Sequence, residues 1–165
     1  MIRLLTAADD TAYRSLWSEA INQHGEHFRT APSDDVPAGI PTAYTDESWT
    51  LGAFEGDRLV GIVSVERERG EKLKHKALLS RMFVEPDSAG SGLGTTLLRE
   101  TLVVASSVPQ LRQVWLTVLE TNEPAQRLYA AAGFRSYSHE PEAVLIGDRY
   151  VAEIQMVRFL RRERR

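Results

Sequence analysis

The stretch VEPDSAGSGLGT, residues 84–95, constrains the fold more than any other part of the sequence. It holds glycines at three alternate positions between an apolar run typical of a strand and LGTTLLRETLVVASS, whose leucines fall on one face of a helix. A strand, a glycine-rich turn and a helix start form an anion site, because the first unpaired N–H groups of the helix point into the turn. The stretch therefore predicts a loop that binds a phosphate group.

The next apolar run, QVWLTVL at 113–119, is short and follows this helix. A helical crossover before a short apolar run indicates a buried strand that lies parallel to the strand before the glycines. Turn signals and periodicity place the other elements. We expect further strands at 2–5, 48–55, 58–68, 73–84, 135–146 and 149–157, helices that begin at Thr6 as N-cap and at 122–134, and a loop at 25–46 with one helical turn.

This order, β-α-β-β-β-α-β-α-β-β, predicts an α/β (α+β) fold with a mixed, mostly antiparallel sheet of six to seven strands and helices on both faces. At 165 residues the chain suits one domain, expected over 1–157. The following segment, 158–165, carries five arginines, and we interpret it as a basic tail that is solvated or that contacts an acidic partner or phosphates.

The composition argues against a secreted, a membrane-bound and a nucleic-acid-binding protein. There is no cysteine, no apolar run near the roughly 18 residues of a membrane span, and no secretory signal pattern, so we expect a cytoplasmic protein without a membrane partner. The net charge of −3 gives no reason to expect a nucleic-acid partner.

The glycine loop fits two familiar phosphate motifs poorly. A P-loop requires a lysine after the glycines, and none follows here. A dinucleotide-binding loop requires a third glycine where Thr95 stands, and the five residues between Val84 and Gly90 make the turn too wide. A simple flexible loop explains one or two glycines, but not three between strong strand and helix signals.

Two segments together resemble the GCN5-related N-acetyltransferase (GNAT) family. MFVEPDSAGSGLGTTLL is similar to its acyl-CoA-binding segment, and LTVLETNEPAQRLYAAAGF is similar to its second signature, so that the likeness covers about 77–135. Ala89 departs from the family, which usually has Arg or Gln there. The resemblance implies acetyl-CoA as co-substrate, bound by Met82, Phe83, Val84, Ala89, Gly90, Ser91, Gly92, Leu93, Gly94, Thr95 and Asn122, with backbone N–H groups carrying most of the diphosphate contact.

The resemblance also implies that Tyr129 is the general acid for the departing thiolate. A phenol with a pKa of about 10 is protonated at neutral pH and can serve a thiolate whose thiol has a pKa of about 8.5. The residues alone leave a second interpretation open, because Tyr129 shares a helical stripe with Ala125, Leu128 and Ala132 and a tyrosine on such a stripe is usually core. Asn122 is likewise either an N-cap or a cofactor contact.

No residue is a clear general base. Where family members often carry a carboxylate or histidine, this sequence has Leu78, Ser80 and Thr117. We take Glu66 as the candidate, with Glu68, His75 and His139 as others, although each is typical of a solvated surface position, and the amine can also lose its proton in water before it binds. We expect no metal.

The resulting hypothesis is an acetyl-CoA-dependent N-acetyltransferase that moves an acetyl group to a primary amine, that of a small molecule, by direct transfer in a ternary complex. A protein or peptide N-acetyltransferase and a non-catalytic acyl-CoA-binding module are the alternatives. The resemblance also allows a homodimer.

Overall fold

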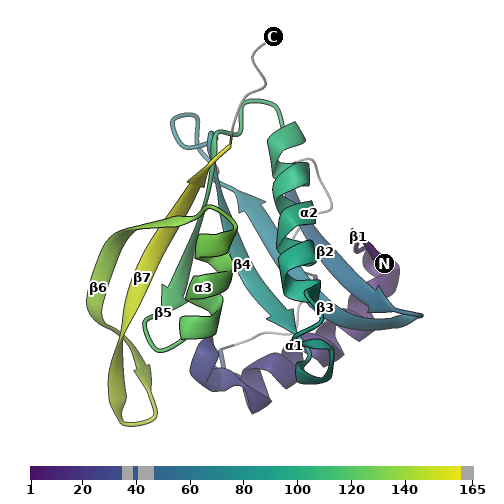
Figure 1. The fold of residues 1–165 in the computed structure, drawn as a ribbon, viewed down its shortest axis with the longest axis horizontal. Coiled ribbons are helices and arrows are strands. Elements are labelled where there is room, and N and C mark those ends of the chain that lie inside the picture. Colours follow the sequence, from purple (N-terminus) through teal and green to yellow (C-terminus); the bar gives the residue numbers. More distant parts are fainter. Residues whose placement is uncertain (35–38, 41–46, 161–165) are drawn as a thin grey trace.

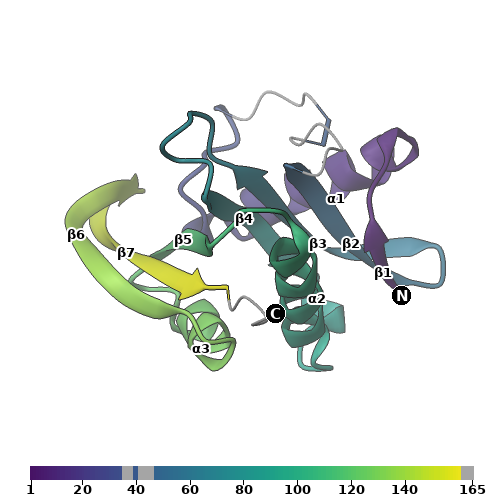
Figure 2. The same cartoon turned by 90° about the horizontal axis from the view of Figure 1, so that it is seen from above.

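The computed structural model describes residues 1–34, 39–40 and 47–160, which form one seven-stranded sheet with helices on both faces (Figures 1 and 2). Helix α1 (Asp10–Gln23) covers one face, and α2 (Leu93–Ser107) and α3 (Glu123–Ala131) cover the other (Figure 2). The strands are β1 (Ile2–Leu4), β2 (Ser48–Glu55), β3 (Arg58–Arg67), β4 (Lys76–Val84), β5 (Gln113–Leu119), β6 (Arg135–Ile146) and β7 (Arg149–Phe159).

The strand order is β1-β2-β3-β4-β5-β7-β6, and every neighbouring pair is antiparallel except β4 and β5. Helix α2 makes the crossover between these two parallel strands, as the sequence predicts. The predicted element order, the mixed sheet and the helices on both faces are confirmed. The loop at 25–46 begins with one 3-10 turn, η2 (Gly25–His27), and its residues 35–38 and 41–46 lie outside the described ranges.

Four predicted strand limits differ from the structure. Strand β1 ends at Leu4 instead of residue 5, and β3 ends at Arg67 instead of residue 68. Strand β4 begins at Lys76 instead of residue 73, because Leu73 and Lys74 donate their N–H groups to the carbonyl of Gly70 and form a turn. Strand β7 continues to Phe159, beyond the expected boundary at 157. Arg158 pairs with β5, and its guanidinium donates to the carbonyl of Ala132 at the end of α3. Arg158 therefore belongs to the sheet and not to the tail, whose residues 161–165 are not described.

The core lies in two layers, one on each side of the sheet. Val63 and Val65 of β3 pack in the layer under α2 and α3, whereas Ile62 packs in the layer under α1. This alternation follows from the two-residue period of a strand, which turns successive side chains to opposite faces. Both faces of the central strands are buried, so the sheet is a rigid support for residues that project from it.

A β-bulge in β4 interrupts the sheet near its centre. Ile62 pairs with Phe83 and Ser64 pairs with Ser80, so that Arg81 and Met82 stand opposite the single residue Val63. Arg81 has a left-handed backbone, with φ of 52°. Such a bulge bends a strand and increases its twist. Beyond the pairs at 76–78, β4 no longer pairs with β5, and the two strands diverge (Figure 1).

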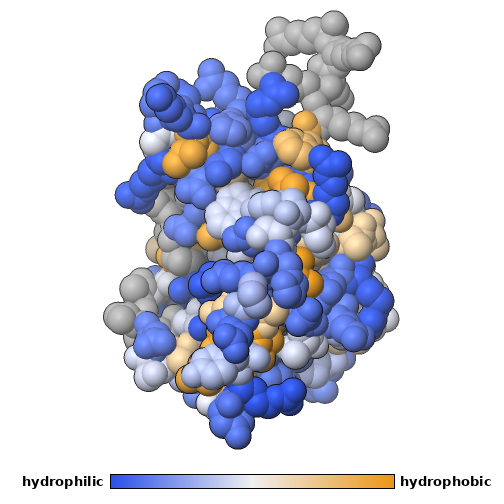
Figure 3. Space-filling model, turned by 90° about the vertical axis from the view of Figure 1, so that its left-hand side faces the viewer, coloured by the Kyte–Doolittle hydropathy of each residue, from blue (hydrophilic) through white to orange (hydrophobic). Residues whose placement is uncertain are grey.

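The face that carries β6 bears on the predicted homodimer. Its edge hairpin exposes Tyr137, Leu145 and Tyr150. Figure 3 shows hydrophobic residues scattered among hydrophilic ones on this face, without one continuous apolar area. Scattered apolar side chains are ordinary on a monomer surface, so the homodimer stays a prediction.

The start of α1 is held by the carboxylate of Asp9. A 3-10 turn, η1 (Ala7–Asp9), with Thr6 as its N-cap, precedes the helix. Asp9 accepts hydrogen bonds at 2.8 Å from both the guanidinium of Arg3 and the N–H of Thr6. These bonds, that of Arg3 first, lower the pKa of Asp9 to about 2.

We predict that Asp9→Asn lowers the free energy of unfolding by about 1 kcal/mol at pH 7, which is typical for loss of a cap. A carboxyl whose folded pKa is depressed stabilises the protein above its unfolded pKa, and this stabilisation is lost as the pH falls toward 2. Urea unfolding of both proteins at pH 7 and pH 2.5 measures the difference, which should shrink at the lower pH. Asp57→Asn, in the exposed β2–β3 turn, is the control. A difference that is the same at both pH values would contradict this role.

Candidate active site

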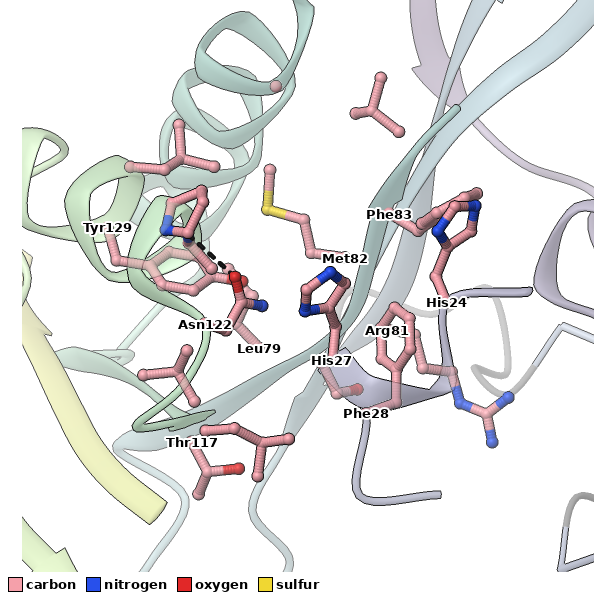
Figure 4. Close-up of a pocket in the computed structure, with 18 of the residues that line it drawn as sticks. His24, His27, Phe28, Leu79, Arg81, Met82, Phe83, Thr117, Asn122 and Tyr129 are labelled. Atoms are coloured by element: carbon pink, nitrogen blue, oxygen red, sulfur yellow. Dashed lines mark hydrogen bonds between the residues drawn. The ribbon is translucent and has the colours of Figure 1, made fainter. Parts of the chain in front are cut away.

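A cleft of about 890 Å³ opens where β4 and β5 diverge. Because the opening passes between two strands, the cleft is lined from both faces of the sheet. The starts of α2 and α3 line it on one face, and the end of α1 with the residues after it line it on the other. Figure 4 shows Asn122 and Tyr129 on one side of Met82, and His24 and Phe28 on the other side.

The wall of the cleft between these halves is the end of β4. Met82, Phe83 and Val84 all line the cleft. Phe83 and Val84 pair with β3 on one side, but no β5 residue pairs with them on the other. The edge of β4 that faces β5 is therefore open, and an open strand edge can pair with an extended ligand through main-chain hydrogen bonds.

The glycine loop lies at the carboxyl end of β4, after the 3-10 turn η3 (Pro86–Ser88) (Figure 1). Gly90 and Gly92 have φ of 83° and 80°, and both line the cleft. The first hydrogen bond of α2 runs from the N–H of Thr96 to the carbonyl of Gly92. The amides of residues 93–95 therefore have no acceptor within the helix, and the positive end of the helix dipole adds to their field. This arrangement can bind an anion.

Nine of the eleven residues expected to bind the cofactor line the cleft: Met82, Phe83, Val84, Ala89, Gly90, Gly92, Gly94, Thr95 and Asn122. The other two, Ser91 and Leu93, do not line it. The hydroxyl of Ser91 donates to the carbonyl of Ser88 at 2.8 Å, and Leu93 packs against the core under α2. Their side chains serve the loop and the helix.

Gly94 differs from the two glycines before it. It lies inside α2 with helical backbone, and an added Cβ would be 3.8–4.0 Å from Leu128, Val84 and Met82, which is ordinary contact. Gly90 and Gly92 have open space around a Cβ but need glycine for their left-handed backbone. The folded chain thus requires glycine at 90 and 92 but not at 94, where the missing side chain leaves room in the cleft.

Tyr129 belongs to both the core and the cleft. Its ring packs edge-on against Phe134, with 5.8 Å between the centroids, and the residue is 8% exposed. It nevertheless lines the cleft, and within the described ranges its hydroxyl has no hydrogen-bond partner. Burial raises the pKa of this phenol well above its usual value. Tyr129 is therefore placed both as a core residue and as a cleft residue, and its side chain stays protonated.

Asn122 also combines two positions. Its Oδ1 accepts a hydrogen bond from the N–H of Ala125 at 3.3 Å, so it caps α3 as the sequence predicts (Figure 4). It lines the cleft as well. Since the cap fixes its side chain at the mouth of the cleft, the amide nitrogen is held in place for a ligand.

The candidate bases are not brought to the cleft. Glu66 is exposed and pairs in register with Leu78, where β4 and β5 are still joined, so it lies at the closed end of the sheet. Glu68 accepts from the indole of Trp115 at 3.2 Å. His139 contacts Glu120 at 3.1 Å, and neither His139 nor His75 lines the cleft.

Glu153 of β7 is a cleft residue that the sequence did not predict. This residue is 3% exposed and lines the cleft, and its Oε1 is 3.4 Å from Nη1 of Arg29. Its signal in the sequence is a single charge inside the apolar strand VAEIQMV. The end of α1 and the following loop contribute further cleft residues that the sequence did not predict: Trp17, His24, His27, Phe28 and Arg29.

In residues 1–34, 39–40 and 47–160 no group of three or more His, Asp and Glu side chains is placed to hold a metal ion. Within the same ranges no helix has the length and apolar character needed to span a membrane.

Comparison with known proteins identifies the family. A family model described as "Acetyltransferase (GNAT) family" matches residues 9–134. The chain belongs to the GNAT family. An uncharacterized N-acetyltransferase of Mycobacterium tuberculosis is 39% identical over 85 residues, which are 52% of this chain and 51% of that protein. The chain thus spans about half the length of the curated relatives it matches.

Solved GNAT structures share the whole fold. A GCN5-related N-acetyltransferase from Kribbella flavida is 26% identical, with a TM-score of 0.84 and 97% of each chain covered. A putative acetyltransferase from Salmonella typhimurium, solved with acetyl-CoA, is 18% identical, with a TM-score of 0.84, and the match covers 100% of this chain and 96% of that one. The second likeness shows the fold alone.

The glycines of the GNAT loop allow a test of the geometry. We predict that Gly92→Ala lowers the free energy of unfolding by about 1 kcal/mol, because a Cβ is strained in the left-handed backbone. Gly94→Ala should leave it unchanged or raise it by a few tenths of a kcal/mol, because alanine favours the helix and meets no clash. Chemical denaturation of both variants measures this, and equal losses would contradict the assignment of the two glycines.

Proposed function

We propose that this GNAT protein is an acetyl-CoA-dependent N-acetyltransferase that moves an acetyl group directly to the primary amine of a small molecule. The observation that carries the proposal is the cleft through the sheet, which has an anion-binding loop and a buried phenol on one face and a buried carboxylate on the other. Two ligands that enter from opposite faces can meet at the open edge of β4, as direct transfer in a ternary complex requires.

The half of the cleft on the α2 and α3 face, here called the cofactor half, fits coenzyme A. The amides at the start of α2 suit the diphosphate, and the open edge of β4 suits the amide groups of the pantetheine arm. Acetyl-CoA supplies an activated acetyl group as a thioester. The acetyl-CoA bound by the Salmonella neighbour supports this choice. Ala89 brings no cation to the loop, so the backbone carries most of the contact to the phosphates.

Tyr129 is the proposed acid. In the transfer, the amine nitrogen bonds to the acetyl carbon and the carbon–sulfur bond breaks. The nitrogen loses its proton to water, the sulfur takes a proton from the hydroxyl of Tyr129, and Tyr129 regains one from water. The hydroxyl of Tyr129 has no partner within the described ranges, so it is available to the sulfur. Burial keeps the phenol protonated until a thiolate forms beside it.

The activity is tested by mixing the protein with acetyl-CoA and a panel of amines, polyamines and peptides while free thiol is measured. Thiol release that depends on an added amine supports the proposal. Tight binding of CoA by calorimetry, with no thiol release above background for any acceptor, would replace it with a non-catalytic acyl-CoA-binding module.

We predict that Tyr129→Phe lowers kcat about 100-fold, within the range usual for loss of a general acid, and leaves the Kd for CoA unchanged. Because burial raises the pKa of Tyr129, its acid form is present at all lower pH values, so the wild-type kcat should not fall between about pH 8 and pH 10. Steady-state kinetics and calorimetry measure both. Full activity of the variant would remove Tyr129 from the mechanism.

The absence of a side chain at Gly94 leaves room for CoA in the cleft. An alanine there costs the folded chain nothing, but its methyl group enters the cleft beside the start of α2. We expect Gly94→Ala to weaken CoA binding about tenfold or more while the protein stays as stable as the wild type. Calorimetry with CoA gives the affinity. Ala130→Gly, on the exposed side of α3, is a control for a change of the same size.

A further inference from the structure

Among the described residues that line the half of the cleft facing α1, one is acidic, Glu153. The Glu153 side chain is 4% exposed, and within the described ranges its one hydrogen-bond partner is Arg29, at 3.4 Å. A carboxylate has acceptor sites for about four hydrogen bonds, and a buried one is costly when they are not used. Glu153 is therefore a buried anion with room for a cationic ligand.

The neighbourhood of Glu153 strengthens its negative field. Its register partner on β6 is Glu140, a second carboxylate directly across the strand pair. Like charges in such a pair repel each other, so the fold gains no stability from this arrangement. A positively charged group that enters the cleft at Glu153 would relieve both the repulsion and the missing hydrogen bonds.

Arg29 supplies the opposite charge at the same place. Its side chain is 62% exposed, and it reaches Glu153 from the loop after η2. Arg81 also lines the cleft, but its guanidinium lies 4.7 Å above the ring of Trp17 and donates to the hydroxyl of Tyr13 at 3.2 Å. Arg29 is thus held less tightly than Arg81, and its guanidinium can turn to an anionic ligand.

Apolar rings form the wall beside this pair of charges. Phe28 packs edge-on against Trp17 at 5.1 Å and against Phe83 at 6.3 Å between ring centroids, and all three line the cleft. Figure 4 shows Phe28 and Phe83 on the same side of the cleft. Trp115 of β5 lines the cleft as well, with its indole nitrogen held by Glu68. Such a wall suits an apolar or aromatic side chain of a ligand.

We propose that the acceptor is a zwitterion of the amino-acid type with an apolar side chain. Its ammonium group binds Glu153 and its carboxylate binds Arg29, so the ligand inserts between two side chains that pair with each other at 3.4 Å. The apolar side chain lies against Phe28 and its neighbours. This inference rests on the proposed acetyltransferase function and names the substrate class of that same site.

Two other acceptor classes fit this half of the cleft less well. A polyamine carries several cations, whereas the described lining offers one carboxylate against Arg29, Arg81 and two histidines. The amino end of a peptide carries an ammonium group but no carboxylate next to it, so it would leave Arg29 without a partner. Both classes are included as outcomes of the test.

The first experiment needs no variant. It compares kcat/KM for phenylalanine with phenethylamine and with phenylalaninamide, and for leucine with isoamylamine, and adds spermidine and a dipeptide with an amino-terminal phenylalanine. We expect the free amino acid to be preferred about tenfold or more in each pair, as for a charge-assisted contact. Equal or better turnover of the amines that lack a carboxylate, or of spermidine or the dipeptide, would overturn the zwitterion.

Two variants then test the charges of Arg29 and Glu153 one at a time. Arg29→Gln should abolish the roughly tenfold preference for phenylalanine over phenethylamine in kcat/KM, because it removes the contact to the carboxylate. Glu153→Gln should raise KM about tenfold or more for every amine. Arg99→Gln, on an exposed position of α2, is the control. Retention of the preference in Arg29→Gln would refute the assignment of Arg29, and an unchanged KM in Glu153→Gln would refute that of Glu153.

Binding of CoA, measured by calorimetry, shows that each variant is folded and has its cofactor half intact. The same measurement distinguishes the two levels of the proposal. If the wild type binds CoA but acetylates no acceptor, the acetyltransferase function itself fails. If it acetylates amines without regard to their carboxylate, the function stands and only the zwitterion is wrong.

Discussion

The bulge at Arg81 is the constraint on which the site depends, because it bends β4 away from β5 and opens the sheet. A left-handed backbone at a residue other than glycine costs about 1–2 kcal/mol. Helix α1 offsets this cost through the guanidinium of Arg81, which stacks on Trp17 and donates to Tyr13, both buried residues of that helix. The packing of α1 therefore does more than cover one face, since it holds open the edge along which a ligand can pair.

Because of this opening, the two faces of the sheet present different kinds of binding group to one cleft. On the α2 and α3 face, groups fixed by helix starts are available: the amides after Gly92 and the side chain of Asn122. On the α1 face, Glu153 comes from a strand, whereas Arg29 comes from a loop and is largely exposed. The first half is built from backbone geometry, which suits one constant cofactor. The second half is built from side chains, which suits the proposed acceptor.

The predicted fold is confirmed, and most of the residues expected to bind the cofactor line the cleft, for one reason. The glycines, the Asn122 cap and the strand and helix periods are local signals, and local signals carry the order of elements and the place of a helix start. The acceptor half depends on contacts between distant segments. Glu153 and Arg29 are 124 residues apart in the chain, and no spacing rule joins them. Glu66 does not line the cleft, and only the register of β3 against β4 shows that it lies at the closed end of the sheet.

The burial of Glu153 and Tyr129 is not explained by stability, and it supports a role of both residues in binding. Both are buried, and both have fewer hydrogen bonds within the described ranges than their polar atoms can make. Elsewhere in the core, Thr50 pairs with Ser64 at 2.8 Å, and Trp49 Nε1 is the one fully buried side-chain nitrogen or oxygen of the described residues that has no partner. A fold selected for stability alone would replace an underused buried carboxylate with an apolar residue, which is often neutral or stabilising. Both residues line one cleft, Tyr129 on one face of the sheet and Glu153 on the other. Their unused hydrogen-bonding capacity is what the binding of two ligands in this cleft would require.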